Sequence, residues 1–216
     1  SGISTPRIDE VAEQGLRYQR FHVTAVCSST RAALLTGRNH HAVGMGVTEE
    51  AALGFPGYTG RIPRSAATLA RVLKDTGYNT MAVGKWHLGH LPRYLPTAQG
   101  FEEYFGLPYS NDMWPFHPAY AKLPPNSAKR KRGFPNLPLI DGNKVIEHNP
   151  DQTQLTTWYT ERAVKFIDEH HEQPFFLELA HSMPHVPLFV SGKYKGKSKK
   201  GIYGDVISEI DWSVGE

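Results

Sequence analysis

The segment RYQRFHVTAVCSSTRAALLTG, residues 17–37, decides the fold around the single cysteine of this 216-residue chain, Cys27. Residues 17–26 alternate in polarity and are rich in strand formers, which predicts a β-strand leading to the cysteine. Residues 29–37 predict a helix that begins directly after the cysteine and stops at glycine. Cys27 is therefore expected at a strand-to-helix junction, where the free N–H groups of a helix terminus favour negative charge.

Further helices and buried strands are expected on both sides of this junction. Helices are predicted from Pro6 to just before Gly15, over 65–76 with Leu69, Val72 and Leu73 on the apolar face, and over 153–170. Strands are predicted at 79–83 and 175–180, and the stretch 91–150, rich in Pro, Gly and Asn, predicts long surface loops. Helices alternating with buried strands indicate an α/β fold with a site at the strand ends.

The composition limits the class of protein. With 39% hydrophobic and 11% aromatic residues the chain can bury a core, and a formal net charge of +3 is too small to indicate a nucleic-acid partner. No stretch approaches the roughly 18 consecutive apolar residues of a membrane span. Residues 1–20 lack the order of a signal peptide. The basic run 129–132 and the lysines from Lys193 to Lys200 are expected to be solvated loops.

Two segments resemble the signatures of type I sulfatases. CSSTRAALLTGR, residues 27–38, is similar to the first signature, and GYNTMAVGKWH, residues 77–87, resembles the second over its whole length. PYSND, residues 108–112, is similar to an arylsulfatase substrate loop, and HSMPHVP, residues 181–187, to a strand end with another site histidine. The resemblance implies an alkaline-phosphatase-like α/β sandwich, a central mixed sheet flanked by helices, with residues 1–216 forming a single fragment of the catalytic domain.

The resemblance also implies that Cys27 is the precursor of formylglycine, made by a formylglycine-generating enzyme. A thiolate would form a sulfur–sulfur linkage with no easy exit, whereas the aldehyde hydrates to a geminal diol. One hydroxyl can attack the ester sulfur and the other can expel sulfate afterwards. Ser29 stands where the most familiar form of the signature has proline, and serine is tolerated there in part of the family.

The other site residues take their roles from the same resemblance. Arg31 would orient the diol and offset its charge, Lys85 would bind sulfate oxygens, and Ser110 would lie near the ester. His185 would protonate the departing alcohol, and His87 would assist deprotonation of the second hydroxyl. Histidine suits both roles because its unperturbed pKa lies near ~6.5. Taken singly, Arg31 could instead be a cation on a helix surface, Lys85 a solvated lysine at a strand end, and His87 a packed histidine.

Calcium and zinc are the two metals that the sequence brings into question. The family's calcium takes several oxygen ligands, which are expected from an aspartate pair before this segment and an Asp-Asn pair after it, so Cys27 alone could touch the metal here. His181 and His185 have the spacing of a zinc helix. Pro184 and Pro187 break that helix, however, and no Glu follows His181, which excludes a zinc protease of that kind.

The expected function is hydrolysis of an aryl or carbohydrate sulfate by a protein that the resemblance places outside the cell, in the periplasm or in the lysosome. Two alternatives remain open. A phosphonate or phosphate monoester hydrolase of the same superfamily could use the same nucleophile and cation, because either substrate is a tetrahedral anion. A sulfatase-like fragment without catalytic activity is the second alternative.

Overall fold

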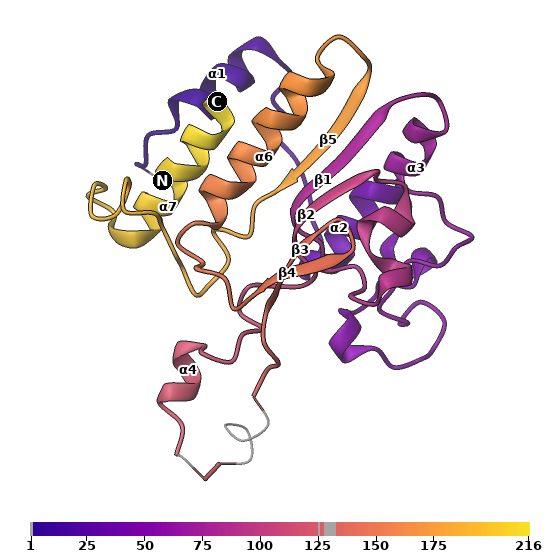
Figure 1. The fold of residues 1–216 in the computed structure, drawn as a ribbon, viewed down its shortest axis with the longest axis horizontal. Helices are drawn as coiled ribbons and strands as arrows, with labels where there is room; N and C mark the ends of the chain where they lie inside the picture. Colours follow the sequence, from indigo (N-terminus) through magenta and orange to yellow (C-terminus); the bar gives the residue numbers. More distant parts are fainter. Residues whose placement is uncertain (1, 125, 128–132) are drawn as a thin grey trace.

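The computed structural model describes residues 2–124, 126–127 and 133–216, and its centre is a five-stranded mixed sheet in the order β4-β3-β2-β1-β5 (Figure 1). β1 pairs in parallel with β2 and with β5, while β3 pairs antiparallel with β2 and with β4. The strands are β1 (Asn79–Lys85), β2 (Glu103–Leu107), β3 (Pro138–Asp141), β4 (Lys144–His148) and β5 (Phe175–Ala180).

Helices flank both faces of this sheet (Figure 1). α6 (Leu155–His170) packs on β1, β2 and β5, and α7 (Gly201–Gly215) packs on α6 and on α1 (Pro6–Gln14). α2 (Cys27–Thr36) and α3 (Leu69–Lys74) lie on the opposite side. The remaining described helices are short: η1 (His40–Val43), η2 (Glu49–Ala51), η3 (Pro92–Tyr94), η4 (Pro96–Gln99) and α4 (Pro118–Ala121).

The core has one layer on each face of β1. Met81 and Val83 belong to a buried cluster with Phe166 of α6, whereas Ala82 belongs to a second cluster with Ala32 of α2. Side chains along a strand point to alternate faces, so the run of apolar residues in β1 serves both layers. This explains why β1 reads as a continuous apolar strand rather than an alternating one.

The main elements expected from the sequence are present. The strands predicted at 79–83 and 175–180 are β1 and β5, and the helix predicted over 153–170 is α6. The short helix that begins at Pro6 is α1. β5 lies at the edge of the sheet, and its residues are half-buried rather than fully buried.

The strand predicted at 17–26 is wrong. This segment is irregular, with bends at Gln19, Ala25 and Val26, and it pairs with no strand in the part of the chain that the structure describes. Its apolar side chains are open to solvent, with Tyr18, Phe21 and Val23 each at least 65% exposed. Alternating polarity favours a strand only where a neighbour supplies the ladder hydrogen bonds and covers one face. The helix that follows begins at Cys27 itself, not after it.

The prediction of loops over 91–150 is also wrong in part, because β2, β3 and β4 lie within this stretch. β2 is five residues long and takes its conformation from pairing with β1. β3 and β4 form a hairpin around Gly142, whose φ of +61° is typical of such turns. The basic run 129–132 lies outside the described residues.

The helix predicted over 65–76 is shorter than expected. Thr68 accepts a hydrogen bond from Arg71 N at 3.1 Å and caps α3, which begins at the next residue. The predicted apolar face is wrong as well, because Leu69 and Val72 are 44% and 52% exposed while Ala70 is buried. α3 therefore packs against the core through the small side chain of Ala70.

No helix among the described residues combines the length and apolar character needed to cross a membrane.

Three strands approach one another closely at Gly84, directly before the residue that ends β1. Gly84 pairs with Gly106 of β2 and with Ala180 of β5. Its φ is +106°, and a Cβ there would lie 2.0 Å from Ala180 O. A Cβ on Gly106 would lie 1.9 Å from Gly84 O. Only glycine allows this approach, which brings the ends of three parallel strands together.

We therefore predict that Gly84→Ala lowers the free energy of unfolding by at least about 3 kcal/mol, because the added carbon meets backbone rather than a movable side chain. Urea denaturation measures the loss. Gly142→Ala is the matched control, since it also has a positive φ but nothing within 4 Å of the added carbon. It should lose only about 1–2 kcal/mol from backbone strain. Equal losses in the two variants would contradict the steric argument.

Candidate active site

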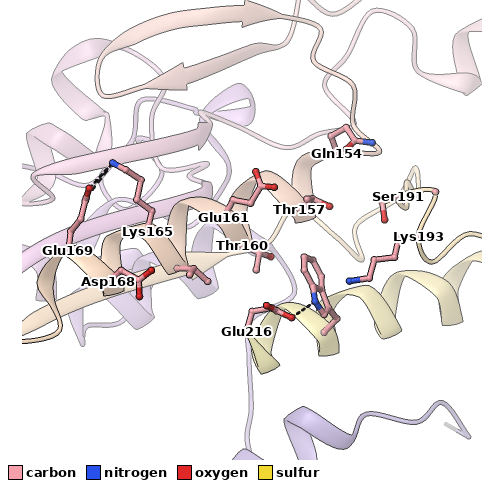
Figure 2. Close-up of a pocket in the computed structure, with 13 residues that line it drawn as sticks. Gln154, Thr157, Thr160, Glu161, Lys165, Asp168, Glu169, Ser191, Lys193 and Glu216 are labelled. Atoms are coloured by element: carbon pink, nitrogen blue, oxygen red, sulfur yellow. Dashed lines mark hydrogen bonds and ion pairs between the residues drawn. The ribbon is translucent and has the colours of Figure 1, made fainter.

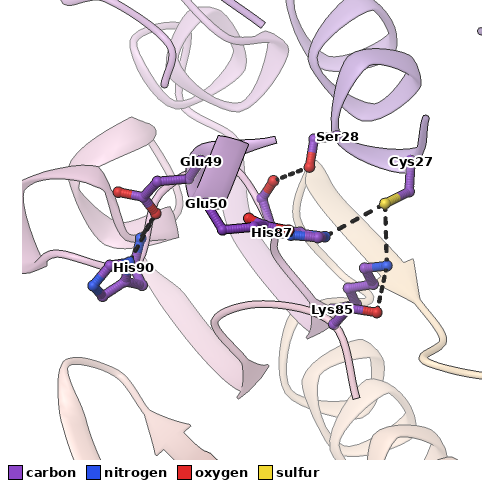
Figure 3. A network of polar contacts seen from close by, with 8 residues as sticks. Cys27, Ser28, Glu49, Glu50, Lys85, His87 and His90 are labelled. Carbon is purple, nitrogen blue, oxygen red and sulfur yellow. Dashed lines mark hydrogen bonds and ion pairs between the residues drawn. The ribbon is translucent and has the colours of Figure 1, made fainter. Parts of the chain in front are cut away.

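Cys27 and Lys85 meet where α2 begins and β1 ends (Figure 3). Lys85 Nζ lies 3.3 Å from Cys27 Sγ and 3.1 Å from Ser110 Oγ. Lys85 is only 7% exposed and Ser110 only 2% exposed. These contacts place a buried cation beside a sulfur atom and a hydroxyl, three groups that come from sequence positions far apart.

His87 is the second residue in contact with the cysteine sulfur (Figure 3). Its Nδ1 is 3.4 Å from Cys27 Sγ, and its Nε2 is 3.2 and 3.3 Å from the two carboxylate oxygens of Glu50 in η2. The backbone of His87 has a φ of +56°, which is unusual for a residue with a side chain. Ser28 Oγ donates to His87 O at 2.6 Å, and His87 N donates to Pro108 O at 3.0 Å. Hydrogen-bonding contacts thus hold both the backbone of His87 and the two nitrogens of its ring.

These contacts shift the ionisation of the cysteine. Burial raises the pKa of the Cys27 thiol, but the hydrogen bond with His87 and the charge of Lys85 outweigh it and lower the pKa to about 6. Cys27 is also the first residue of a ten-residue helix, whose terminus favours an anion. The site therefore stabilises negative charge at position 27.

The hydrogen bond between His87 and Glu50 shifts the pKa values of both groups. Burial lowers the pKa of His87, while its hydrogen bonds with Cys27 and Glu50 raise it, and the net shift is upward. Burial raises the pKa of Glu50, but the hydrogen bond with His87 and other contacts lower it to about 2. Glu50 is therefore a carboxylate at any pH at which the fold is expected to persist.

Arg31 lies one helical turn after the cysteine, but its guanidinium group is held elsewhere. Arg31 Nε donates to Trp86 O at 2.7 Å, and Arg31 Nη2 forms an ion pair with Glu178 Oε1 of β5 at 2.9 Å. Both partners of this ion pair are largely buried. Arg31 thus fastens α2 to β1 and β5, and its expected contact with the group at position 27 stays a prediction.

His185 lies after the end of β5, in the loop that also contains Pro187. Its Nδ1 is 2.7 Å from Val186 O, and it is half-buried. Asn111, the neighbour of Ser110, donates to Pro187 O at 3.3 Å and so joins the His185 loop to the loop after β2. None of the hydrogen bonds of the described residues connects His185 with Cys27, so its place beside the nucleophile stays a prediction.

Sequence reasoning missed the acidic partners of the site. Glu50 holds His87, Glu178 holds Arg31, and Glu49 accepts hydrogen bonds from the backbone and ring of His90 at 2.9 and 2.8 Å. The tandem acids in EEA, residues 49–51, were the only local signal. A partner 37 positions away from His87 cannot be identified from spacing alone.

The donor set around Cys27 does not fit calcium. Calcium prefers several oxygen ligands, whereas the neighbours of Cys27 are an ammonium group and an imidazole nitrogen. Among the described residues, no group of three or more His, Cys, Asp or Glu side chains is arranged to hold a metal ion.

A separate hollow of about 770 Å³ lies between α6 and α7 (Figure 2). Neither Cys27 nor Lys85 lines it. The charged residues that line it are four acids and two lysines: Glu161, Asp168, Glu169, Glu216, Lys165 and Lys193. A surplus of carboxylates repels anions, so this hollow is not suited to a sulfate or phosphate ester.

Comparison with known proteins gives consistent matches. The Sulfatase family model matches residues 1–216. The chain is 37% identical to arylsulfatase G of Rattus norvegicus, over 98% of this chain and 42% of that protein. It is 36% identical to N-acetylgalactosamine-6-sulfatase of Mus musculus, over 98% of this chain and 41% of that protein. The chain thus spans about two fifths of the length of the curated relatives it matches.

The solved structures agree with the sequence comparison. The crystal structure of the PsFucS1 sulfatase from Pseudoalteromonas sp. matches with a TM-score of 0.78 and 25% sequence identity, over 98% of this chain and 45% of that chain. This likeness confirms the predicted alkaline-phosphatase-like α/β fold, present here as part of a domain.

We predict that the unmodified thiol of Cys27 is alkylated by iodoacetamide with a midpoint near pH 6, because the thiolate is the reactive form and its pKa is about 6. Alkylation rates measured from pH 4 to 10 give the midpoint. Lys85→Met should raise it, because the variant removes a cation from beside the sulfur. Ser110→Ala is the control, since Ser110 contacts the lysine but not the thiol, and its midpoint should not move. A midpoint near 8.5 in the unaltered chain, the value of an ordinary thiol, would contradict the prediction.

Proposed function

Because the chain belongs to the sulfatase family, we propose that the protein containing it hydrolyses sulfate esters with residue 27 as the nucleophile. One observation carries the proposal: Cys27 Sγ lies between Lys85 Nζ at 3.3 Å and His87 Nδ1 at 3.4 Å. A nucleophile beside a cation and a base is the arrangement that transfer of a tetrahedral anion requires. A formylglycine at this position supplies, in its hydrated form, the hydroxyl that attacks sulfur and the hydroxyl that later expels sulfate.

Lys85 and Ser110 would bind the sulfuryl group. The ammonium group is held at Ser110 Oγ and is buried, so solvent screens its charge only weakly. Negative charge on the sulfuryl oxygens would be stabilised by a donor that is already in place and needs no reorganisation. Lys85 is therefore proposed to be the main electrostatic contact of the substrate in this part of the protein.

His87 would accept the proton of the second hydroxyl while the bond from that carbon to the sulfate oxygen breaks. Its Nδ1 faces position 27, as this role requires. We assign Glu50 as the positioning residue of His87, because its carboxylate accepts from Nε2–H and leaves the lone pair of Nδ1 directed at residue 27. The same arrangement of a nucleophile, a histidine and a carboxylate orients the base in other hydrolases.

His185 is proposed to protonate the departing alcohol. Its Nδ1 hydrogen donates to Val186 O, so Nε2 is the nitrogen that could face a substrate. Its loop is joined to the Ser110 loop through Asn111, which supports a place near the ester. Arg31 is proposed to act mainly by holding α2, and with it residue 27, against β1 and β5.

A carbohydrate sulfate or an aryl sulfate is the proposed substrate. The names of the relatives, an N-acetylgalactosamine-6-sulfatase and an arylsulfatase, support these two classes. A phosphate monoester carries one more negative charge than a sulfate monoester near neutral pH. The described site offers one buried lysine, and the carboxylate of Glu50 offsets part of its charge because His87 acts as a neutral base. This low positive charge favours the sulfate ester over the phosphate ester.

Three further parts of the proposal concern the complete protein. A formylglycine-generating enzyme would convert Cys27, calcium would be held by oxygen ligands that the described residues do not supply, and the protein would be exported or lysosomal. Family membership supports the first two, since both are general features of sulfatases. The compartment is proposed by analogy with the family alone.

The proposal is tested with the complete protein, produced together with a formylglycine-generating enzyme. The tryptic peptide FHVTAVCSSTR, residues 21–31, should lose roughly 18 Da, the difference between CH₂SH and CHO. The converted protein should hydrolyse an aryl sulfate faster than the matching aryl phosphate, and Cys27→Ala should abolish turnover. Asp168→Asn, in the hollow between α6 and α7, is the control and should keep full activity.

Two results would overturn this proposal. Faster turnover of the aryl phosphate would identify a phosphate monoester hydrolase instead. If the peptide shows complete conversion and neither ester is hydrolysed, the non-catalytic alternative is correct.

Glu50→Gln tests the positioning role separately. We expect kcat to fall about 10- to 100-fold with KM nearly unchanged, because the amide no longer enforces one imidazole tautomer. Nitrogen-15 NMR of the ring should show loss of the Nε2–H tautomer of His87. Glu49→Gln removes the same charge from the adjacent residue, which pairs with His90, and should leave kcat and the tautomer unchanged. An unchanged tautomer in Glu50→Gln would show that the carboxylate has no positioning role.

A further inference from the structure

The side chain of Asn111, the residue after Ser110, is buried where three segments of the chain meet. Asn111 is 0% exposed. Its Nδ2 donates to Gln152 Oε1, just before α6, at 3.0 Å and to Pro187 O, in the loop after β5, at 3.3 Å. Gln152, which is 3% exposed, donates back from Nε2 to Asn111 O at 3.1 Å. One amide group thus joins the loop after β2 to the start of α6 and to the loop that carries His185.

The two donors of this amide decide how the side chain is oriented. A primary amide has two N–H donors, and the nitrogen of Asn111 faces two acceptor oxygens. Asn111 Oδ1, by contrast, has no hydrogen-bond partner among the described residues. A buried acceptor without a partner is destabilising, so the donated bonds must hold the group in this orientation. A hydrophobic side chain or an aspartate at this position would not supply them.

The His185 loop is held on both sides of the histidine. Before it, Ser182 is 2% exposed, its backbone oxygen accepts from His185 N at 3.3 Å, and its Oγ lies 3.2 Å from Tyr159 Oη of α6. After it, Pro187 O accepts from Asn111. The position of this half-buried histidine therefore depends on hydrogen bonds to buried groups on either side.

A second contact between the two loops is apolar. The rings of Trp114, in the loop after β2, and Phe189, in the loop after β5, have centroids 5.7 Å apart and planes at 85°. This is the edge-to-face geometry that aromatic pairs prefer. The ring contact keeps the loops side by side independently of the amide. Shortening the Asn111 side chain is therefore expected to loosen the His185 loop without unfolding it.

We propose that Asn111 is a positioning residue, which sets His185 against the ester oxygen of a substrate bound near Ser110. This rests on the proposed function, in which His185 is the general acid, and adds the group that fixes its place. When the bond between sulfur and the ester oxygen breaks, the electron pair stays on that oxygen, which takes the proton from His185 Nε2. Such a transfer contributes about 10²–10⁴-fold to the rate. A misplacement of ~1 Å costs on the order of 100-fold.

The leaving group tests this proposal on the complete, converted protein. The oxygen of a sugar alcohol is strongly basic and must be protonated as it departs, whereas 4-nitrophenolate is a stable anion near neutral pH. Asn111→Ala should therefore lower kcat for a sugar sulfate about 10- to 100-fold, but kcat for 4-nitrophenyl sulfate less than about threefold. Both rates are measured on one preparation, so their ratio does not depend on the folded fraction. Asn111→Asp keeps the size, replaces the donor with an oxygen, and should show the same selective loss.

Two further variants complete the comparison. His185→Ala should show a larger loss with the same selectivity, and adding Asn111→Ala to it should lower the rates little further, because Asn111 acts through the histidine. Asn79→Ala is the matched control. Asn79 Nδ2 donates to Gln173 Oε1 at 2.9 Å at the opposite end of β1, so the variant removes the same kind of bond and should leave both rates unchanged.

Hydrogen exchange followed by mass spectrometry gives a readout that needs no turnover. Residues 181–190 should exchange faster in Asn111→Ala than in the unaltered protein, because the loop has lost one of its anchors. Exchange in β1 should not change in that variant, and exchange in residues 181–190 should not change in Asn79→Ala.

The outcomes separate this inference from the proposed function. Equal losses for both substrates in Asn111→Ala would show a merely structural role, and unchanged exchange in residues 181–190 would show that the amide does not hold the loop. Either result overturns the positioning role. Selectivity in His185→Ala without selectivity in Asn111→Ala would refute the positioning role and leave the proposed function intact. If His185→Ala itself shows no dependence on the leaving group, the proposed acid role of His185 is wrong, and Asn111 positions no acid.

Discussion

The buried ammonium group of Lys85 is the constraint around which the rest of the site is arranged. A buried cation is costly unless an anion or strong acceptors surround it. Among the described residues Lys85 forms no ion pair with a carboxylate, and its contacts are Cys27 Sγ and Ser110 Oγ. The lysine therefore favours negative charge at its neighbours, and with the hydrogen bond from His87, the larger cause, it lowers the pKa of Cys27. A tetrahedral anion would satisfy the same requirement.

The backbone makes this arrangement possible. The parallel strands β1, β2 and β5 end at one edge of the sheet, where Lys85 is the last residue of β1 and the loops after β2 and β5 carry Ser110 and His185. The close contact at Gly84 and Gly106 sets how near these ends can come. α2 then adds residue 27 from the other layer, and the ion pair of Arg31 with β5 keeps that helix in place. The position of residue 27 thus depends on packing between elements that are far apart in the sequence.

This dependence explains what the sequence could and could not predict. The strands β1 and β5 and the helix α6 were predictable because their apolar side chains pack in the core and so leave a regular apolar pattern in the sequence. Cys27, Lys85 and His87 were identified because the two segments that contain them, residues 27–38 and 77–87, resemble sulfatase signatures. Their acidic partners were not, because an ion pair across dozens of residues leaves no local pattern. The segment 17–26 shows the opposite error, since it has a strand pattern but no partner among the described residues.

Burial decides over what range the charge of a cationic side chain acts. Lys85 is enclosed, so its field acts at short range in a medium of low dielectric constant and changes little with salt. The charges of exposed side chains, by contrast, are screened over roughly 8 Å at physiological ionic strength. A buried lysine suits a reacting group that must be stabilised at one point.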